Sequence, residues 1–140
     1  MAEIKTYNIT FKGYRLQDDV DNLPEYSGIY IAYRCKYNED TDKVTLIELV
    51  YIGQAENMKL RLMSHKNSKD ISQYCGKDET ICYSYASVSL YDLDIVENAL
   101  VFAQKPRLNV KLKDNFTHNA ASFVIEGACA LLEYTNYKIS

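Results

Sequence analysis

Single polar residues separate apolar ones near the start of the chain. In residues 4–14 the side chains of Tyr7, Ile9 and Phe11 fall on every second position, which is the pattern of a β-strand with one buried face. Residues 80–88 form a second stretch rich in β-branched and aromatic residues, and they predict another strand. Strands are therefore expected from both the first and the middle part of the chain.

A β-hairpin is predicted between these two strands. Residues 28–34 and 44–52 are rich in strand-forming residues, and the segment 38–43 between them is polar and acidic. This combination predicts two strands joined by a polar tip, with Gly53 ending the second strand. Residues 18–24, which precede the hairpin, are predicted to be a loop.

The first predicted helix covers residues 57–66. Asn57 is of the residue type that caps helix N-termini. Leu60 and Met63 are three residues apart and form an apolar pair on one face. This helix follows directly on the predicted hairpin.

The last third of the chain predicts a second helix and a hairpin. The helix covers residues 93–104, with Asp92 near its start, where an acid suits the helix dipole, and with Pro106 stopping it. In residues 123–134, β-branched and aromatic residues flank Gly127. A hairpin or a short helix fits this segment, and we favour the hairpin.

These elements together predict an α+β fold. We expect a small antiparallel β-sheet flanked by helices, with an N-terminal strand and a C-terminal β-hairpin extension. The length of 140 residues suits one domain. We therefore expect a single domain over residues 1–140, with a core of about 25–110 and an extension over 110–140.

The composition excludes several classes of protein. Hydrophobic residues make up 47% of the chain and charged residues 25%, which is typical of a folded domain and not of a disordered or fibrous chain. No stretch of about 20 apolar residues could span a membrane, and no secretory segment follows the first residues. We therefore expect a cytoplasmic protein without a membrane partner.

The cysteines do not predict a metal site. They are Cys35, Cys75, Cys82 and Cys129, and none belongs to a C-x-x-C pair. A zinc site needs clustered ligands, so this spacing argues against one. Because no secretory signal is found, free buried thiols are favoured over disulfides.

Charge is distributed unevenly along the chain. The net charge of −3 taken alone disfavours a nucleic-acid partner, because binding phosphates requires positive charge. However, half of the 16 basic residues lie in two segments without any acid, 59–69 and 98–113. These segments are either solvent-exposed faces or binding surfaces.

Four separated groups of residues could carry chemistry. They are Gly28-Ile29-Tyr30, Tyr51-Ile52-Gly53, Arg61 with His65, and Glu97 with Asn109. Each group alone has an ordinary structural explanation, since tyrosines are common on half-buried strands and residues four apart can share one exposed helix face. The order of the four groups is more informative than any one of them.

In this order the four groups resemble the GIY-YIG nuclease family. The two tripeptides give the family its name. Arg61 stands ten residues after Tyr51 and His65 four further on, which are family spacings. Glu97 lies on a later predicted helix, where the family keeps its metal-binding glutamate, and Asn109 matches the asparagine that ends the family's domain. The resemblance covers somewhat more than half of the chain.

The resemblance implies both a fold and an activity. The family core is a short antiparallel sheet flanked by helices, with both tripeptides on paired strands, which agrees with the strands expected from the pattern alone. Family members cut phosphodiester bonds in DNA with one divalent metal ion, and they occur in homing endonucleases, repair excision nucleases and some restriction enzymes. We therefore expect a metal-dependent endonuclease acting on DNA, although the sequence does not distinguish DNA from RNA.

The residue types suit this chemistry. Glu97 is a single hard oxygen ligand with no second acid evident, and one carboxylate suits Mg²⁺ or Mn²⁺, because such an ion keeps most of its waters and borrows substrate oxygens. We expect one ion per active site, near the leaving oxygen, because a two-metal site needs more acids. Arg61 is permanently charged and forked, which suits the phosphate of the transition state.

The attacking water must lose a proton. In the family a tyrosine of one tripeptide is thought to act as the base. We assign Tyr30 as the base and Tyr51 as its partner, because nearby cations such as Arg61 can favour a phenolate. His65 could instead take the proton or polarise a tyrosine, since it titrates near neutrality. Asn109, Lys59 and Lys66 are the expected substrate-binding residues, with Asn109 also orienting the backbone or the region of Glu97.

The chain departs from the family in two ways. Twenty residues separate Tyr30 from Tyr51, about twice the family interval, so the strands are long or the tip at 38–43 is an elaborated loop. Little chain remains outside the core for reading DNA. Specificity therefore comes from a homodimer or a partner protein, or the enzyme acts on an unusual or local structure.

Two other functions remain open at this point. The chain could be a non-cleaving module that keeps the GIY-YIG scaffold and binds nucleic acid or protein. It could also be a plain interaction domain in which the motifs occur by coincidence. The filled family positions favour the nuclease.

Overall fold

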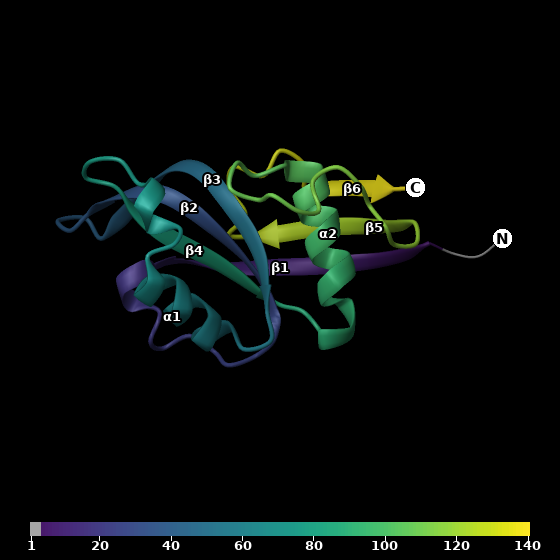
Figure 1. Cartoon of the computed structure of the whole chain (residues 1–140), viewed down its shortest axis with the longest axis horizontal. Helices are drawn as coiled ribbons and strands as arrows, with labels where there is room; N and C mark the ends of the chain where they lie inside the picture. The colour runs from purple at the N-terminus through teal and green to yellow at the C-terminus, as the bar shows by residue number, and fades with distance from the viewer. Residues whose placement is uncertain (1–3) are drawn as a thin grey trace.

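The computed structural model describes residues 4–140, which form a six-stranded sheet and two α-helices (Figure 1). The strands are β1 (Lys5–Leu16), β2 (Gly28–Asn38), β3 (Lys43–Ala55), β4 (Thr80–Ser87), β5 (Ala121–Gly127) and β6 (Asn136–Ile139). The helices are α1 (Met58–Ser68) and α2 (Leu93–Gln104). The predicted α+β class is confirmed. Residues 1–3, where the sequence shows no secretory segment, lie outside the described residues.

The sheet is mixed and not wholly antiparallel. Its strand order is β3-β2-β4-β1-β5-β6. Neighbouring strands are antiparallel except β1 and β5, which run parallel from Lys5 opposite Ala121 to Phe11 opposite Gly127. A parallel pair needs a long connection, and here almost the whole chain lies between the two strands. Strands β1, β5 and β6 thus extend the same sheet beyond residues 25–110.

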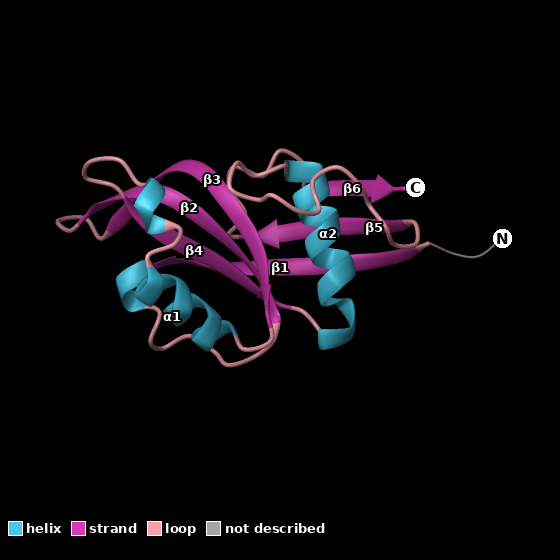
Figure 2. Cartoon of the chain, viewed as in Figure 1, coloured by secondary structure: helices cyan, strands magenta, loops and turns pink. Residues whose placement is uncertain are grey.

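The two helices cover opposite faces of the sheet, because successive side chains of a strand point in opposite directions. On β2, Ile29, Ile31 and Tyr33 pack into the cluster that holds the buried side chains of α2. Tyr30 and Ala32 pack into a second cluster with the buried side chains of α1. Figure 2 shows the two helices against the strands. A strand covered on both faces is buried throughout, which explains the continuous apolar run from residue 28.

The helix limits agree closely with the sequence. The Asn57 side chain accepts a hydrogen bond from the backbone N–H of Leu60 at 3.1 Å, so the predicted N-cap is confirmed. However, the predicted apolar pair is wrong, because Leu60 is 59% exposed. The buried face of α1 instead consists of Met58, Leu62 and His65, which are spaced four and three residues apart.

The hairpin is long, which accounts for the wide interval between the two tripeptides. β2 and β3 pair from Gly28 opposite Ala55 to Asn38 opposite Lys43, with two register shifts. The tip is short, and the Asn38 side chain accepts a hydrogen bond from the backbone of Asp40 at 2.9 Å. The prediction that Gly53 ends the second strand is wrong, since it pairs with Tyr30 inside the hairpin.

The C-terminal hairpin exists but differs in its turn. β5 and β6 pair antiparallel, with Ala121 opposite Ile139. The predicted turn at Gly127 is wrong, because Gly127 is the last residue of β5 and a longer loop follows it. There the backbone N–H of Ala128 donates to the carbonyl of Phe11 at 2.9 Å. The chain thus hydrogen-bonds to β1 after Gly127 and does not form the tight turn expected there.

Two further features bear on the expectations from composition. All four cysteines are free thiols; Cys35 and Cys82 are buried, and Cys75 and Cys129 are half-buried. None of the helices in residues 4–140 is long and apolar enough to cross a membrane.

Candidate active site

A buried phenol and a buried imidazole meet between β2 and α1. The Tyr30 hydroxyl lies 2.6 Å from His65 Nε2, and neither side chain is appreciably exposed. The other ring nitrogen, Nδ1, lies 2.9 and 2.8 Å from the two carboxylate oxygens of Asp70. Tyr30, His65 and Asp70 therefore form one hydrogen-bonded chain that runs from the sheet to the surface.

Glycine at position 53 makes room for this chain. Gly53 lies directly opposite Tyr30 on the paired strand. A Cβ atom at Gly53 would overlap the Tyr30 hydroxyl and lie 2.6 Å from the ring carbon that carries it. It would also come within 2.9 Å of the Tyr51 ring. The glycine of the second tripeptide thus allows the two phenols to pack beside each other.

Tyr51 and Arg61 border a cavity next to the buried chain. The cavity has a volume of about 300 Å³, and Tyr51, Arg61, His65 and Asp70 are among its lining residues. The Tyr51 ring lies 6.2 Å from the Tyr30 ring, measured between centroids. Arg61 is exposed on α1, so its guanidinium can reach a ligand in the cavity.

Burial governs the protonation of these groups. It raises the pKa of Tyr30 and of Tyr51 above the ordinary value, and the Arg61 guanidinium partly opposes the rise in both. Burial also lowers the pKa of His65, which the carboxylate of Asp70 partly opposes. Both phenols are therefore protonated and the imidazole is neutral near pH 7.

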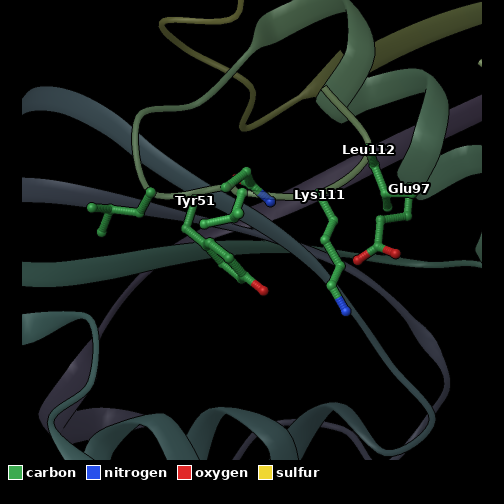
Figure 3. Close-up of a pocket in the computed structure, with 7 residues that line it drawn as sticks. Tyr51, Glu97, Lys111 and Leu112 are labelled. Carbon is green, nitrogen blue, oxygen red and sulfur yellow. The ribbon is translucent and has the colours of Figure 1, made fainter. Parts of the chain in front are cut away.

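Glu97 borders a second cavity that Tyr51 also lines. This cavity has a volume of about 440 Å³ and is lined by Tyr51, Glu97, Asn109, Lys111 and neighbouring residues. In Figure 3 the Lys111 side chain lies between the Tyr51 hydroxyl and the Glu97 carboxylate. Tyr51 lines both cavities, so it connects the part of the site on α1 with the part on α2.

Gln54 holds Glu97 at this edge of the sheet and binds Asp94 beside it. The Gln54 amide on β3 donates to Glu97 Oε1 and to Asp94 Oδ1, each at 2.9 Å. Burial raises the pKa of Glu97, the hydrogen bond from Gln54 opposes the rise, and Asp94 adds to it. The expectation that no second acid lies near Glu97 is therefore incomplete, since Asp94 shares the same amide.

The oxygens at this edge fit a hydrated Mg²⁺ ion better than a fully enclosed one. Among residues 4–140 no group of three or more His, Cys, Asp or Glu side chains could hold a metal. Glu97 faces a cavity large enough for an ion with its waters, and Mg²⁺ often binds through one or two carboxylates plus substrate oxygens. The single-carboxylate metal site expected from the sequence stays a prediction, with Glu97 as the residue that would hold the ion.

Asn109 holds the backbone of β3. Its side-chain oxygen accepts from the N–H of Ile52 at 3.0 Å, and its side-chain amide donates to the carbonyl of Ile52 at 2.8 Å. Asn109 itself is 7% exposed. The Asn109 side chain thus satisfies both backbone groups of Ile52 on the outer edge of β3, between Tyr51 and Gly53. This agrees with a role in orienting the backbone.

The two lysines expected to bind substrate lie away from the cavities. Lys66 is 3.7 Å from the carboxylate of Asp21 in the loop before β2. Lys59 is half-buried on the first turn of α1, and neither lysine lines the cavities that share Tyr51. The structure brings together Tyr30, Tyr51, Arg61, His65 and Glu97, and it leaves these two lysines outside.

Four residues at the site, Asp94 among them, were not identified from the sequence. Lys111 belongs to the acid-free segment 98–113, which was the available signal. Gln54 directly follows the second tripeptide, but an amide in a strand has no distinctive pattern. Asp70 stands two residues beyond the end of α1, and no spacing rule relates it to His65.

Comparison with curated proteins finds relatives that share one name. The chain is 30% identical over 101 residues to UvrABC system protein C of Dictyoglomus thermophilum, a match that covers 71% of this chain and 15% of that protein. It is 31% identical over 121 residues to UvrABC system protein C of Treponema denticola, covering 84% of this chain and 16% of the relative. The Bacteroides fragilis protein of the same name is 32% identical over 109 residues, covering 74% of this chain and 16% of that protein.

The chain thus spans about 15% of the length of the first curated relatives that it matches. No family model matches the chain, and no solved structure matches it.

Proposed function

We propose that this protein is a GIY-YIG-type endonuclease that hydrolyses phosphodiester bonds in DNA. The observation that carries the proposal is the convergence of two phenols, a guanidinium, an imidazole and a carboxylate on two cavities that share Tyr51. These groups come from β2, β3, α1 and α2. Hydrolysis of a phosphodiester needs positive charge at the phosphate, a base for the water and help for the leaving oxygen, and this set can supply each.

Two cations at the cavities that share Tyr51 can bind the phosphate. Arg61 borders the smaller cavity and Lys111 the larger one. Arg61 can make two parallel hydrogen bonds to phosphate oxygens, whereas Lys111 acts as a point charge. Tyr51 lines both cavities, so its hydroxyl can contact the same phosphate. In this arrangement the scissile phosphate binds next to Tyr51.

Glu97 is the proposed metal ligand. A bound Mg²⁺ or Mn²⁺ ion supplies charge neutralisation at the leaving oxygen. Gln54 orients the Glu97 carboxylate through its hydrogen bond to Oε1. Asp94, on the same amide, adds negative charge that favours a cation at this edge.

Tyr30 is the proposed base, with His65 receiving its proton. The Tyr30 hydroxyl has a strong acceptor in His65 Nε2 at 2.6 Å. Tyr30 has no exposed surface. This role therefore requires that the side chains around the Tyr30 hydroxyl rearrange and admit the water.

The relatives support a nuclease of this class. The site residues resemble those of a family that includes repair excision nucleases. The curated relatives are named UvrABC system protein C. We propose DNA as the partner in the cytoplasm. A homodimer or a partner protein supplies the specificity that the small core leaves open.

A plasmid-nicking assay tests the proposal. Supercoiled DNA is incubated with the protein and Mg²⁺ or Mn²⁺, beside Glu97→Ala and the matched control Glu126→Ala on the exposed part of β5. Nicking that needs the metal and falls at least about 100-fold in Glu97→Ala, with the control unchanged, supports the endonuclease. Equal nicking by Glu97→Ala and the parental protein contradicts it.

The burial of Tyr30 favours one alternative, a non-cleaving module that binds nucleic acid on the same scaffold. Fluorescence anisotropy with a labelled duplex separates the two functions. Tight binding without nicking, unchanged in Glu97→Ala, favours the binding module. Tyr30→Phe is the second discriminating variant, because nicking at the parental rate would contradict its assignment as base.

A further inference from the structure

Asp70 is the end of the buried chain and is not accounted for by the proposed function. Its carboxylate contacts His65 Nδ1 through both oxygens. The carboxylate is itself held in place, since Oδ1 also accepts from the N–H of Ile71 at 2.8 Å. The main-chain carbonyl of Asp70 accepts from the Gln73 side chain at 2.7 Å. These contacts fix the carboxylate although the side chain is 49% exposed.

The contact with Asp70 determines which nitrogen of His65 carries the proton. An ionised carboxylate can only accept hydrogen bonds, so Nδ1 must be the protonated nitrogen. A neutral imidazole has one donor and one acceptor, so Nε2 then carries the lone pair. Because Nε2 faces the Tyr30 hydroxyl at 2.6 Å, the phenol donates its proton toward His65. Without the Asp70 carboxylate, the other neutral tautomer of His65, with the proton on Nε2, is equally available.

We propose that Asp70 is a positioning residue of the nuclease reaction, which keeps the Nε2 lone pair of His65 aimed at the Tyr30 hydroxyl. This inference rests on the proposed function. The water gives its proton to the Tyr30 oxygen as the Tyr30 proton passes to Nε2. The hydroxide forms the new bond to phosphorus, and the leaving oxygen departs with the electron pair of the broken bond and takes a proton from solvent. The imidazolium formed lies against the Asp70 carboxylate and later returns its proton to solvent.

The surroundings of His65 leave the stabilisation of the imidazolium to Asp70. Tyr30 on β2 and Tyr51 on β3 face the imidazole with rings that are neutral when protonated. Arg61 on α1 opposes a positive charge on His65. Asp70 is the acid that pairs with the imidazole within the described chain. A carboxylate at this position stabilises the charged form that the proton transfer creates.

Nuclear magnetic resonance tests the tautomer without any substrate. Long-range proton–nitrogen correlations report which imidazole nitrogen is protonated, and the chain contains only His65 and His118, so His118→Gln assigns the signals. We expect Nδ1–H in the parental protein, in Asp70→Glu and in the exposed control Asp40→Asn. In Asp70→Asn we expect a large loss of this tautomer. An Nε2–H imidazole in the parental protein overturns the proposal, and so does an Nδ1–H imidazole that is fully retained in Asp70→Asn.

The pH profile of nicking tests the role in the reaction. Because Asp70 raises the pKa of His65, its removal moves the acid limb of the profile to lower pH. The plateau rate falls at the same time by about 10-fold or more, because the imidazolium loses its partner. If Asp70 had only a structural role, its removal would lower the plateau rate but would not shift the acid limb of the pH profile. We expect Asp70→Glu to recover most of the plateau and DNA affinity to stay within about two-fold in both variants.

The two arms separate failure of this inference from failure of the proposed function. If the parental protein does not nick DNA, the proposed function and the role of Asp70 in it both fail, and the resonance experiment still reports whether Asp70 sets the tautomer. If the parental protein nicks DNA and Asp70→Asn leaves both the plateau and the acid limb unchanged, only the inference about Asp70 is overturned.

Discussion

Single residues hold the backbone so that the side chains of the candidate site can meet. Gly53 leaves space for the hydroxyl of Tyr30 on the opposite strand. Asn109 hydrogen-bonds both backbone groups of Ile52, which keeps Tyr51 and Gly53 in position on either side. The tripeptides therefore matter for packing as much as for chemistry, and this gives two predictions at the scale of the residue.

We expect Gly53→Ala to destabilise the fold by about 1–3 kcal/mol, because an added methyl group would overlap Tyr30 in a fully packed site. Urea unfolding measures the change. Gly76→Ala is the matched control, since a Cβ there would meet only the Glu79 side chain, at 3.3 Å. Adding Tyr30→Phe to Gly53→Ala should recover part of the loss, and equal stability of the control and Gly53→Ala would contradict the packing argument.

We expect Asn109→Ala to destabilise the fold by about 2–4 kcal/mol, because it leaves a buried N–H and a buried C=O of Ile52 without partners. The free energy of unfolding in urea is again the measurement. Asn119→Ala, at an exposed loop position, is the control and should change stability by less than about 0.5 kcal/mol. A small effect at Asn109 would mean that water replaces its amide.

At the scale of elements, the site depends on α1 more than on any other helix. α1 carries Arg61 on its exposed side and His65 on its buried side, and Asp70 follows directly after it. β3 contributes Tyr51 and Gln54 from the edge of the sheet, where α2 and residues 108–112 also lie. The site therefore forms where both helices approach one sheet edge.

We expect Asn57→Ala to cost about 1 kcal/mol, because it removes the hydrogen bond that caps the first turn of α1. Asn57→Ser should keep most of the stability, since serine caps equally well. Asn67→Ala, exposed in the last turn, serves as the control on the same helix. Thermal or urea unfolding of the three variants measures the effect, and equal values for Asn57→Ala and the control would exclude a role for the cap.

At the scale of the whole molecule, charge is separated along the hairpin. The acidic tip lies eight residues along β2 from Tyr30, which corresponds to about 26 Å at roughly 3.3 Å per residue. This is far beyond the screening length of about 8 Å at physiological salt. A net charge of −3 is therefore compatible with DNA at the site, because the acids of the tip are too far from the site to repel the phosphates of DNA.

We expect neutralising the tip by Glu39→Gln and Asp40→Asn to leave DNA affinity and nicking within about two-fold at 0.15 M salt. In contrast, Lys111→Gln should weaken DNA binding at all sequences and reduce the slope of log affinity against log salt by about 0.9. Anisotropy titrations at several salt concentrations measure both. A stronger effect of the tip variants than of Lys111→Gln would contradict this assignment of the binding surface.

Local patterns along the chain predict the secondary-structure elements and name most residues of the candidate site. Period-two and helical spacings depend on neighbouring residues, so the strands from 28 and 44, the N-cap at Asn57 and the extent of α2 could be predicted locally. The ordered spacing of Arg61, His65 and Glu97 after the tripeptides also lies within the chain.

The contacts between distant segments could not be predicted from local patterns. The parallel pairing of β1 with β5, the burial of Tyr30 and the meeting of Asp70 with His65 depend on how the chain crosses itself in space. The same holds for the bridge from Gln54 to Glu97. A polar side chain at such a place has no periodic signal, because its partner is chosen by geometry and burial and not by its neighbours in sequence.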